Sequence, residues 1–266
     1  MDNRAIGIFD SGLGGLTAVR ALRALLPEEN IVYFADTGRM PYGGRSLEQI
    51  RRMALQDLEF VASYGVKAVL VACGTISSNA PELLDGFRLP AFGVLRSGVR
   101  AMAELPGEGS LAVIATEASI RSGSFERALR EACPGREILP VPCPDFVPLI
   151  ESGHTQPGDP LLRASVERTL RPLRERGAEA VLLGCTHYGL IAGAITEFLG
   201  AQVKLVGAAD SAAQTLCAYL TAEGLTGGSG EERYFTSGSG ADFARAAATF
   251  LGRELAAAEE IPVMEV

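Results

Sequence analysis

One short segment of this chain occurs twice, and the repeat constrains the possible folds more than any other feature. Residues 65–73 read GVKAVLVAC and residues 177–185 read GAEAVLLGC. Each copy is a mostly aliphatic run of strand length that begins with glycine and ends with cysteine. Runs of this kind are typical of strands in parallel sheets that are covered on both faces. The repeat therefore predicts two related halves, each built around one copy.

Strand-like and helix-like segments alternate along nearly the whole chain, which predicts an α/β protein with two parallel sheets. Apolar runs predict strands at residues 6–9, 31–34, 66–71, 91–94, 111–114, 138–141, 181–183 and 203–206. Amphipathic patterns predict helices at residues 16–26, 47–64, 122–132, 161–176, 212–222 and 242–255.

These segments suggest where the two domains begin and end. We expect a first α/β domain over residues 1–95, completed by the C-terminal residues 208–266, and a second over residues 96–207. Residues 96–109 contain proline and glycine and are interpreted as part of the crossing between the halves. The helices predicted after residue 207 would return to pack on the first domain.

Charge and hydropathy exclude several classes of partner. The formal net charge is −8, whereas nucleic acids and anionic membranes select basic surfaces. No apolar run approaches the roughly 18 residues of a membrane span. The first residues lead directly into a strand without a secretory pattern. We therefore expect a cytoplasmic protein that binds neither nucleic acid nor membrane.

The five cysteines contain no C-x-x-C pair, so they form neither a disulfide framework nor a zinc site. A single cysteine at a strand end is more often a core residue than a catalyst. Packing alone, however, does not explain a thiol at the same place in both copies, Cys73 and Cys185. A disulfide between them is the third possibility, and disulfides are rare in the cytosol.

The position of the two thiols suggests a chemistry. Ligands of parallel α/β sheets bind at the carboxyl ends of the strands, and a hydroxyl follows each thiol closely, Thr75 and Thr186. If a pseudo-twofold axis relates the halves, the thiols face one another across a cleft. That arrangement suits a reaction that removes a proton from one face of a carbon and returns one to the other, as in a racemase or epimerase. The lysines, Lys67 and Lys204, lie in or beside strands, so we expect no pyridoxal cofactor, and no metal.

Other predicted strands also end in polar residues. The first is followed by Asp10-Ser11-Gly12-Leu13-Gly14-Gly15, the second by Asp36-Thr37-Gly38 and then Pro41-Tyr42-Gly43-Gly44, and a strand of the second half by Thr116. Asp10 and Ser11 either bind an amino-acid ligand together with backbone N–H groups, or cap the following helix. A carboxylate at this turn argues against a nucleotide phosphate.

Seven motifs, in order along nearly the whole chain, resemble those of the glutamate racemases in the aspartate/glutamate racemase superfamily. They are Phe9-Asp10-Ser11-Gly12-x-Gly14-Gly15-Leu16-Thr17, Asp36-Thr37, Pro41-Tyr42-Gly43, Ala72-Cys73-x-Thr75, Ile120-Arg121-Ser122-Gly123, Phe146-Val147-Pro148-Leu149-Ile150-Glu151 and Leu183-Gly184-Cys185-Thr186-His187-Tyr188. The resemblance implies two pseudo-symmetric flavodoxin-like domains with the active site in the cleft between them. It also implies cofactor-free interconversion of L- and D-glutamate for peptidoglycan, and we expect a homodimer.

The resemblance also implies roles for individual residues. Cys73 would be the base for D-glutamate and Cys185 the base for L-glutamate. Asp10 and His187 would assist the thiols, with Asp36 and Glu151 as supporting polar neighbours. The residues that match substrate-holding positions are Ser11, Pro41, Tyr42, Gly43, Gly74, Thr75, Thr116 and Thr186.

One departure from the family pattern lies within the site. The family normally has asparagine after the first cysteine, where this chain has Gly74. That asparagine usually contacts the charged α-groups of the substrate, and such a hydrogen bond contributes roughly 1.5–3 kcal/mol, or about ten- to a hundredfold in affinity. The alternatives are therefore a paralogue with another amino-acid substrate, or a weakly catalytic regulatory or binding protein. If the amide is simply missing, Gly74→Asn is expected to lower the Michaelis constant. If the site is rebuilt for another substrate, or uses water or a neighbouring side chain as the donor, the added asparagine is expected to crowd the cleft and impair the enzyme.

Overall fold

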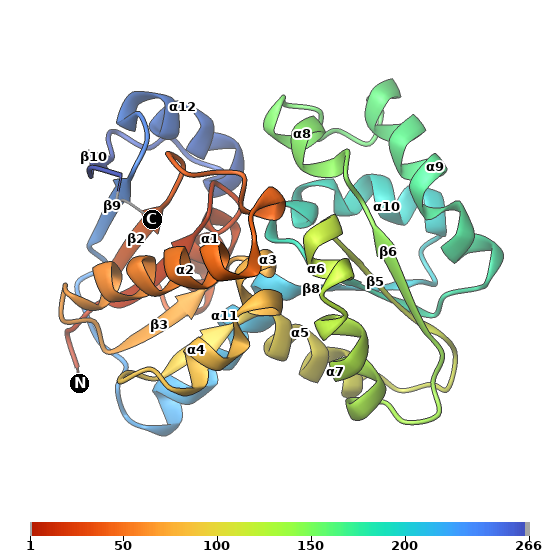
Figure 1. Cartoon of the computed structure of the whole chain (residues 1–266), viewed down its shortest axis with the longest axis horizontal. Helices are drawn as coiled ribbons and strands as arrows, with labels where there is room; N and C mark the ends of the chain where they lie inside the picture. The colour runs from red at the N-terminus through yellow and green to blue at the C-terminus, as the bar shows by residue number, and fades with distance from the viewer. Residues whose placement is uncertain (1, 264–266) are drawn as a thin grey trace.

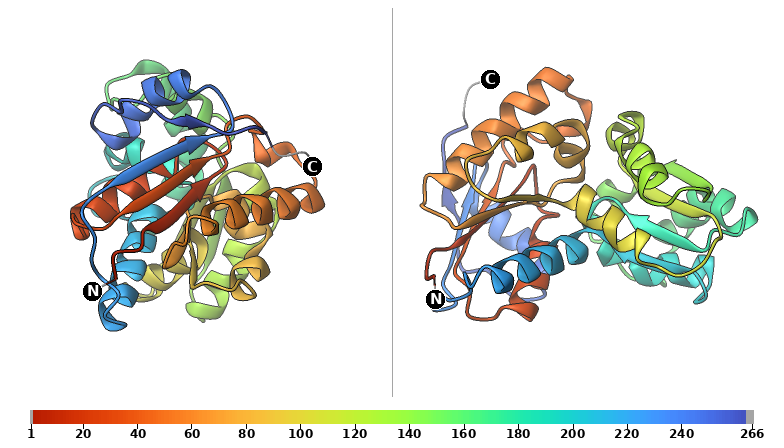
Figure 2. Two further views of the ribbon diagram at one scale, coloured as in Figure 1. Left: turned by 90° about the vertical axis from the view of Figure 1, so that its left-hand side faces the viewer. Right: turned by 90° about the horizontal axis from the view of Figure 1, so that it is seen from below.

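The computed structural model describes residues 2–263, which form two lobes side by side, each built on a parallel sheet (Figures 1 and 2). The larger sheet has the strand order β10-β9-β2-β1-β3-β4, and the smaller has the order β6-β5-β7-β8. The strands of the larger sheet are β1 (Ile6–Asp10), β2 (Ile31–Ala35), β3 (Ala68–Val71), β4 (Ala91–Gly93), β9 (Glu232–Thr236) and β10 (Glu259–Glu260). Those of the smaller sheet are β5 (Leu111–Ala115), β6 (Ile138–Pro142), β7 (Ala180–Leu183) and β8 (Lys204–Gly207).

Helices connect these strands and cover the sheets. The first lobe contains α1 (Leu16–Leu25), η1 (Tyr42–Gly44), α2 (Leu47–Ala62), α3 (Gly74–Asn79) and α4 (Pro81–Asp85). The second contains α6 (Glu117–Arg121), α7 (Ser124–Ala132), α8 (Phe146–Glu151), α9 (Pro160–Glu175), η2 (Thr186–Ile191) and α10 (Ala192–Leu199). The remaining helices are α5 (Val94–Ala103), α11 (Ala208–Ala222) and α12 (Gly240–Leu251).

The sequence repeat is also a structural repeat. Strands β2-β1-β3-β4 of the first lobe have the same order as β6-β5-β7-β8 of the second, which is the flavodoxin-like order. Gly65 and Gly177, which begin the two copies, both adopt left-handed backbone, with φ of 67° and 64°. Cys73 and Cys185 follow equivalent strands with similar extended backbones, φ −111° and φ −119°. The predicted α/β fold of two related parallel-sheet halves is confirmed.

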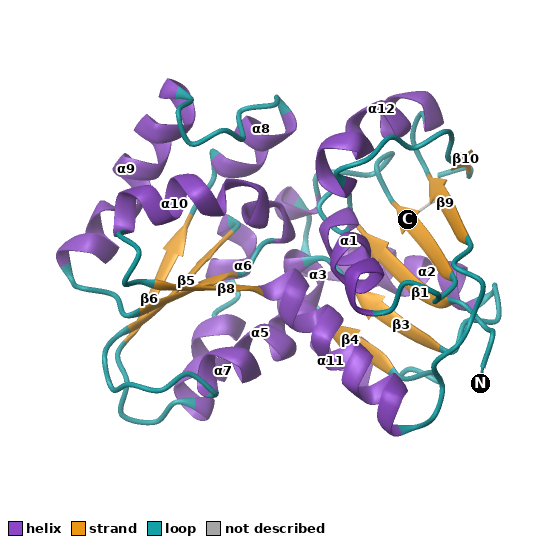
Figure 3. Cartoon of the chain, turned by 180° about the vertical axis from the view of Figure 1, so that it is seen from behind, coloured by secondary structure: helices purple, strands orange, loops and turns teal. Residues whose placement is uncertain are grey.

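Helices α5 and α11 carry the chain between the lobes and lie between the two sheets (Figure 3). Each of them contacts strands of both sheets, and α11 packs against α1. A single buried cluster therefore extends from Tyr33 of the first sheet to Leu182 of the second. The first part of residues 96–109, the segment interpreted as part of the crossing between the halves, belongs to helix α5, which contacts both sheets. The expected boundary at residue 96 falls inside α5. The domain limits stay a prediction.

Two short strands were not expected from the sequence. β9 pairs in parallel with β2, so that Tyr33 lies opposite Tyr234, and β10 pairs with β9. Both follow the Gly/Ser-rich segment after α11, and they extend the first sheet by residues from near the end of the chain. Within residues 2–263, none of the helices is both long and apolar enough to cross a lipid bilayer.

Candidate active site

A cavity of about 530 Å³ is lined by residues of both lobes, at the carboxyl ends of the two sheets. The first lobe contributes residues that follow β1, β2 and β3, and the second contributes residues that follow β5, β6 and β7. All the predicted site residues except Asp36 line this cavity: Asp10, Ser11, Pro41, Tyr42, Gly43, Cys73, Gly74, Thr75, Thr116, Glu151, Cys185, Thr186 and His187. The parallel strands thus bring together residues that are far apart in the sequence.

Cys73 lies beside a hydroxyl group, with a carboxyl group next to that hydroxyl. Its sulfur lies 3.2 Å from Oγ of Ser11, which in turn donates a hydrogen bond to Asp10 at 3.2 Å. Burial, followed by the charge of Asp10, raises the pKa of the Cys73 thiol well above its usual range. Burial likewise raises the pKa of Asp10. Without substrate, Cys73 is therefore a thiol.

Asp10 lies at the start of α1 and at the cavity. Its carboxylate accepts a hydrogen bond from the backbone N–H of Gly15, directly before α1, so it satisfies one of the free donors at that helix end. It also lines the cavity beside Ser11. The interaction with the helix end is observed, and ligand binding by Asp10 stays a prediction.

Cys185 lies beside a cationic group instead. Its sulfur is 3.7 Å from Nδ1 of His187, whose Nε2 lies 3.0 Å from a carboxylate oxygen of Glu151. Burial lowers the pKa of His187, but hydrogen bonds to Cys185 and Glu151, with the charges of Cys185 and Asp10, outweigh it and raise the pKa to about 10. The ring is also packed edge-on against Phe250, with centroids 5.2 Å apart. His187 is therefore protonated at neutral pH, and its positive charge lies beside the Cys185 sulfur.

Asp36 lies behind the cavity wall rather than in it. It is fully buried, and it accepts hydrogen bonds from Ser237 and Arg39, each at 2.6 Å, and from the hydroxyl of Tyr42. The same Tyr42 hydroxyl is 2.8 Å from Asp57, which also pairs with Arg39 at 2.6 Å. This buried network holds the segment that carries Pro41, Tyr42 and Gly43 to the cavity.

Hydrogen bonds join the two lobes on either side of the thiols. The Oγ1 atoms of Thr75 and Thr116 are 3.2 Å apart. Thr17, at the start of α1, donates to the backbone carbonyl of Thr186 at 3.2 Å. These contacts hold the strand ends that carry Cys73 and Cys185 against one another.

The chemistry of the lining indicates a small amino-acid ligand. No lysine or arginine from the described part of the chain lines the cavity, so His187 is its cationic side chain. Hydroxyls of Ser11, Thr75, Thr116 and Thr186 supply donors for a carboxylate. The carboxylates at the cavity supply acceptors for an ammonium group.

Sequence reasoning missed several lining residues, most notably Cys143. This cysteine directly follows β6, and burial together with Cys185 and Asp145 raises the pKa of its thiol. Cys73 and Cys185 were identified because they follow predicted strands of a parallel sheet, and the same criterion would have identified Cys143. Met40 and Glu117 also line the cavity, and the only sequence signal for them was adjacency to the predicted motifs. Val147, another lining residue, lies inside a quoted motif but was not singled out.

Comparison with known proteins agrees with this geometry. The model of the Asp/Glu/Hydantoin racemase family matches residues 17–216. A glutamate racemase of Beutenbergia cavernae is 40% identical, over 96% of this chain and 92% of the relative.

The chain belongs to the Asp/Glu/hydantoin racemase family.

Solved structures of this racemase family share its fold. A glutamate racemase isoform of Bacillus anthracis superimposes with a TM-score of 0.91 at 30% identity, covering 99% of this chain and 98% of the other. A glutamate racemase of Francisella tularensis, solved in complex with D-glutamate, gives a TM-score of 0.89 at 33% identity, with 98% of both chains covered. The resemblance drawn from the seven motifs is confirmed. The roles of individual site residues stay predictions.

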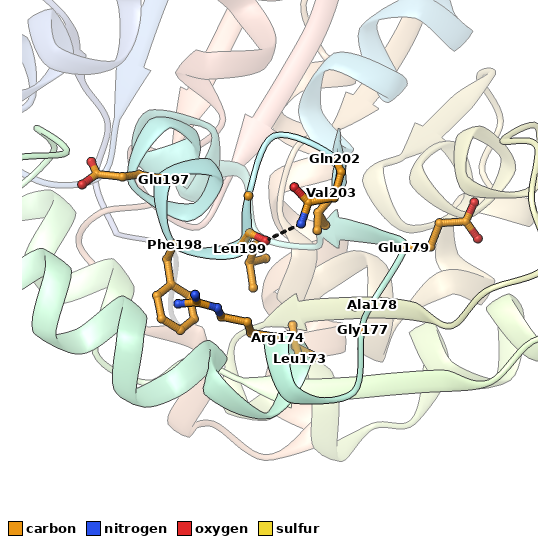
Figure 4. A pocket seen from close by; sticks show the side chains of 11 residues that line it. Leu173, Arg174, Gly177, Ala178, Glu179, Glu197, Phe198, Leu199, Gln202 and Val203 are labelled. Atoms are coloured by element: carbon orange, nitrogen blue, oxygen red, sulfur yellow. Dashed lines mark hydrogen bonds between the residues drawn. The ribbon is translucent and has the colours of Figure 1, made fainter.

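A second cavity, of about 490 Å³, lies on the second lobe of this racemase-family chain (Figure 4). It is formed where α9 and α10 meet the loops before β7 and β8, and Arg174 lies over the ring of Phe198 at 5.2 Å. None of the predicted site residues lines it. It is therefore separate from the thiols.

Proposed function

We propose that this chain interconverts L- and D-glutamate, with Cys73 and Cys185 as the two bases. The observation that carries the proposal is the pair of thiols at the ends of the equivalent strands β3 and β7, both lining one cavity and each with its own acid–base partners. A two-base racemisation needs such a pair, because one group removes a proton from the α-carbon while the other supplies one to the opposite face.

The charges favour a definite starting state. A thiolate is the active base, and the His187 imidazolium beside Cys185 stabilises it there. In the L-to-D direction this thiolate takes the α-proton, and the electron pair of the C–H bond is delocalised into the α-carboxylate. The Cys73 thiol then gives its proton to the other face and becomes a thiolate beside Ser11. In the D-to-L direction Asp10, with its raised pKa, would first accept the proton of Cys73.

Substrate recognition in this proposal relies on hydroxyl and backbone donors. Negative charge grows on the α-carboxylate during the reaction, and donors already in place stabilise it without reorganisation. Ser11, Thr75 and Thr186 are suitable donors because all three line the cavity near a thiol. The D-glutamate complex of the Francisella relative supports glutamate as the ligand class.

The biological setting belongs to the same proposal. We assign to the product a role in peptidoglycan synthesis, in the cytoplasm, because the motifs resemble those of enzymes with that task. A homodimer is part of this proposal, and light scattering of the purified chain at several concentrations tests it.

The deciding experiment follows α-proton exchange by NMR in deuterated water with a panel of L-amino acids. Glutamate should lose its α-proton signal and appear as the D-enantiomer, while other amino acids exchange far more slowly. Preferential turnover of a different amino acid would replace glutamate in the proposal and favour a paralogue with a changed substrate. Absence of exchange with every amino acid would favour the regulatory or binding alternative.

A further inference from the structure

Gly74 lies at a close approach of the two lobes. It directly follows Cys73, and a Cβ atom built on it would lie less than 3.0 Å from the backbone carbonyl oxygen of Gly184, which directly precedes Cys185. Its φ is not in the left-handed region, so the backbone itself would accept a side chain. Only the carbonyl from the other lobe excludes one.

A second glycine of the first lobe meets the same segment. A Cβ atom on Gly14 would come within 3.0 Å of Nδ1 of His187 and of Oγ1 of Thr186. The interlobe hydrogen bond from Thr17 to Thr186 lies close by, at 3.2 Å. Two separate segments of the first lobe therefore contact the Cys185 segment at positions where a glycine hydrogen fits and a Cβ atom does not.

We propose that Gly74 is a positioning residue that sets the spacing of the two thiols. This inference rests on the proposed racemisation. Without a side chain after Cys73, the lobes close until the backbone of Gly74 meets the Gly184 carbonyl, and any side chain at position 74 acts as a wedge. The expectation that Gly74→Asn lowers the Michaelis constant is therefore reversed, because the asparagine Cβ has no room at this spacing.

The spacing matters because each thiol must reach the same carbon from opposite faces. Reacting atoms need to approach to about 3–3.5 Å, and a misplacement of about 1 Å can cost on the order of a hundredfold. A reaction that uses only one thiol as a base is less sensitive to the spacing of the two thiols. In the elimination from a β-chloro amino acid, one thiolate takes the α-proton, the C–H electron pair forms the Cα–Cβ double bond, and chloride leaves with the C–Cl pair.

The test compares Gly74→Ala and Gly74→Asn with a matched control, Gly189→Ala. Gly189 lies in η2, the helix that carries Thr186 and His187, but no atom lies within 4 Å of its Cβ position. We expect Gly74→Ala to lower kcat/KM for racemisation by about tenfold or more while elimination stays within about threefold. Gly74→Asn should do the same more strongly, and Gly189→Ala should change neither rate. An equal fall of both reactions, an unchanged racemisation, or a lower KM in Gly74→Asn would overturn the inference.

A crystal structure of Gly74→Ala gives a readout that does not depend on the substrate. The Thr75–Thr116 and Thr17–Thr186 distances, both 3.2 Å, should lengthen together. Unchanged distances would contradict the wedge even if the proposed substrate were wrong, whereas inactivity of the unmodified enzyme on glutamate would contradict only the proposed function.

If Gly74→Ala does not fold, Thr17→Val serves in its place, because at similar volume it removes the hydroxyl that contacts Thr186 of the other lobe at 3.2 Å and the Gly14 carbonyl at 2.7 Å. It should also lower racemisation more than elimination, and a parallel loss of the two would count against the inference.

Discussion

Cys185 and His187 form a buried sulfur–imidazole pair, with Sγ and Nδ1 3.7 Å apart. The equivalent thiol, Cys73, has a serine hydroxyl as its neighbour instead. The two cysteines thus share a strand position and a backbone conformation but differ in their electrostatic surroundings. In the proposed reaction, the L-to-D direction therefore depends on His187 beside Cys185, whereas the D-to-L direction depends on Asp10 as the acceptor of the Cys73 proton.

Replacing either thiol should abolish racemisation, because a proton must be handled on each face of the α-carbon. We expect Cys73→Ala and Cys185→Ala to convert no measurable L-glutamate to D-glutamate by polarimetry. Each variant should retain elimination from the β-chloro amino acid whose α-proton faces the remaining thiol. Cys217→Ala, in α11 and outside the cavity, is the control and should be fully active. Complete L-to-D conversion by Cys185→Ala would refute the two-base assignment.

Glu151→Gln should shift the alkaline limb of the pH–rate profile to lower pH. His187 must be protonated to stabilise the thiolate, and its pKa of about 10 places the loss of activity with L-glutamate above that pH. Glutamine replaces the carboxylate with a neutral amide oxygen, which is a weaker acceptor for the charged imidazole, so the pKa falls and the activity is lost earlier as the pH rises.

Asp159→Asn, which alters the other histidine–carboxylate pair, is the control and should leave the profile unchanged. An identical alkaline limb in Glu151→Gln and the unmodified enzyme would show that Glu151 does not act through His187.

Activity should survive dialysis, chelators and carbonyl-trapping reagents, because both proposed bases are thiols of the chain itself. Iodoacetamide should inactivate the enzyme, and glutamate should slow the inactivation. Mass spectrometry should find the protected label on Cys73 and Cys185, while labelling of the partly buried Cys217 is unaffected by glutamate. Inhibition by a chelator that added zinc reverses would instead establish a metal-dependent reaction.

Tyr42→Phe should weaken both folding and substrate binding. The hydroxyl of Tyr42 contacts Asp36 and Asp57 in a buried network, and leaving buried polar groups without a partner costs about 1–3 kcal/mol. Denaturant titration measures that loss, and KM for glutamate should rise because Tyr42 lines the cavity. Tyr219→Phe is the matched control, since the described structure gives the Tyr219 hydroxyl no hydrogen bond and its ring packs on Phe92.

Local sequence patterns predicted the strands that form the centre of each sheet. Residues 31–34 and 111–114 are continuous apolar runs, and the observed strands extend each of them by a single residue. β9 escaped prediction because its sequence, ERYFT, begins with charged residues and follows a flexible Gly/Ser segment. Its place in the sheet depends on pairing with β2, a tertiary contact that local propensity does not encode.

The distinction between local sequence patterns and tertiary contacts also applies to the site. Strand ends are local features, so Asp10, Cys73 and Cys185 were found from the sequence, and Cys143 obeys the same rule. The close approach of Gly74 to Gly184 was not predictable, because it depends on how the two lobes pack. The position of Asp36 behind Tyr42 depends on a hydrogen bond from Ser237, which lies 201 residues further along the chain, and on Arg39 and Tyr42, which also bind Asp57.

The pairing of β9 with β2 has a consequence for the way this protein is made. During synthesis, all four strands of the second sheet emerge before residues 232–236, which β2 needs as its neighbour. The second lobe is then able to fold while the first sheet still has an open edge at β2. Such edges promote association between chains. Residues 232–236 therefore close an edge of β2 that is open while the second sheet and, apart from β10, the rest of the first sheet are already synthesised.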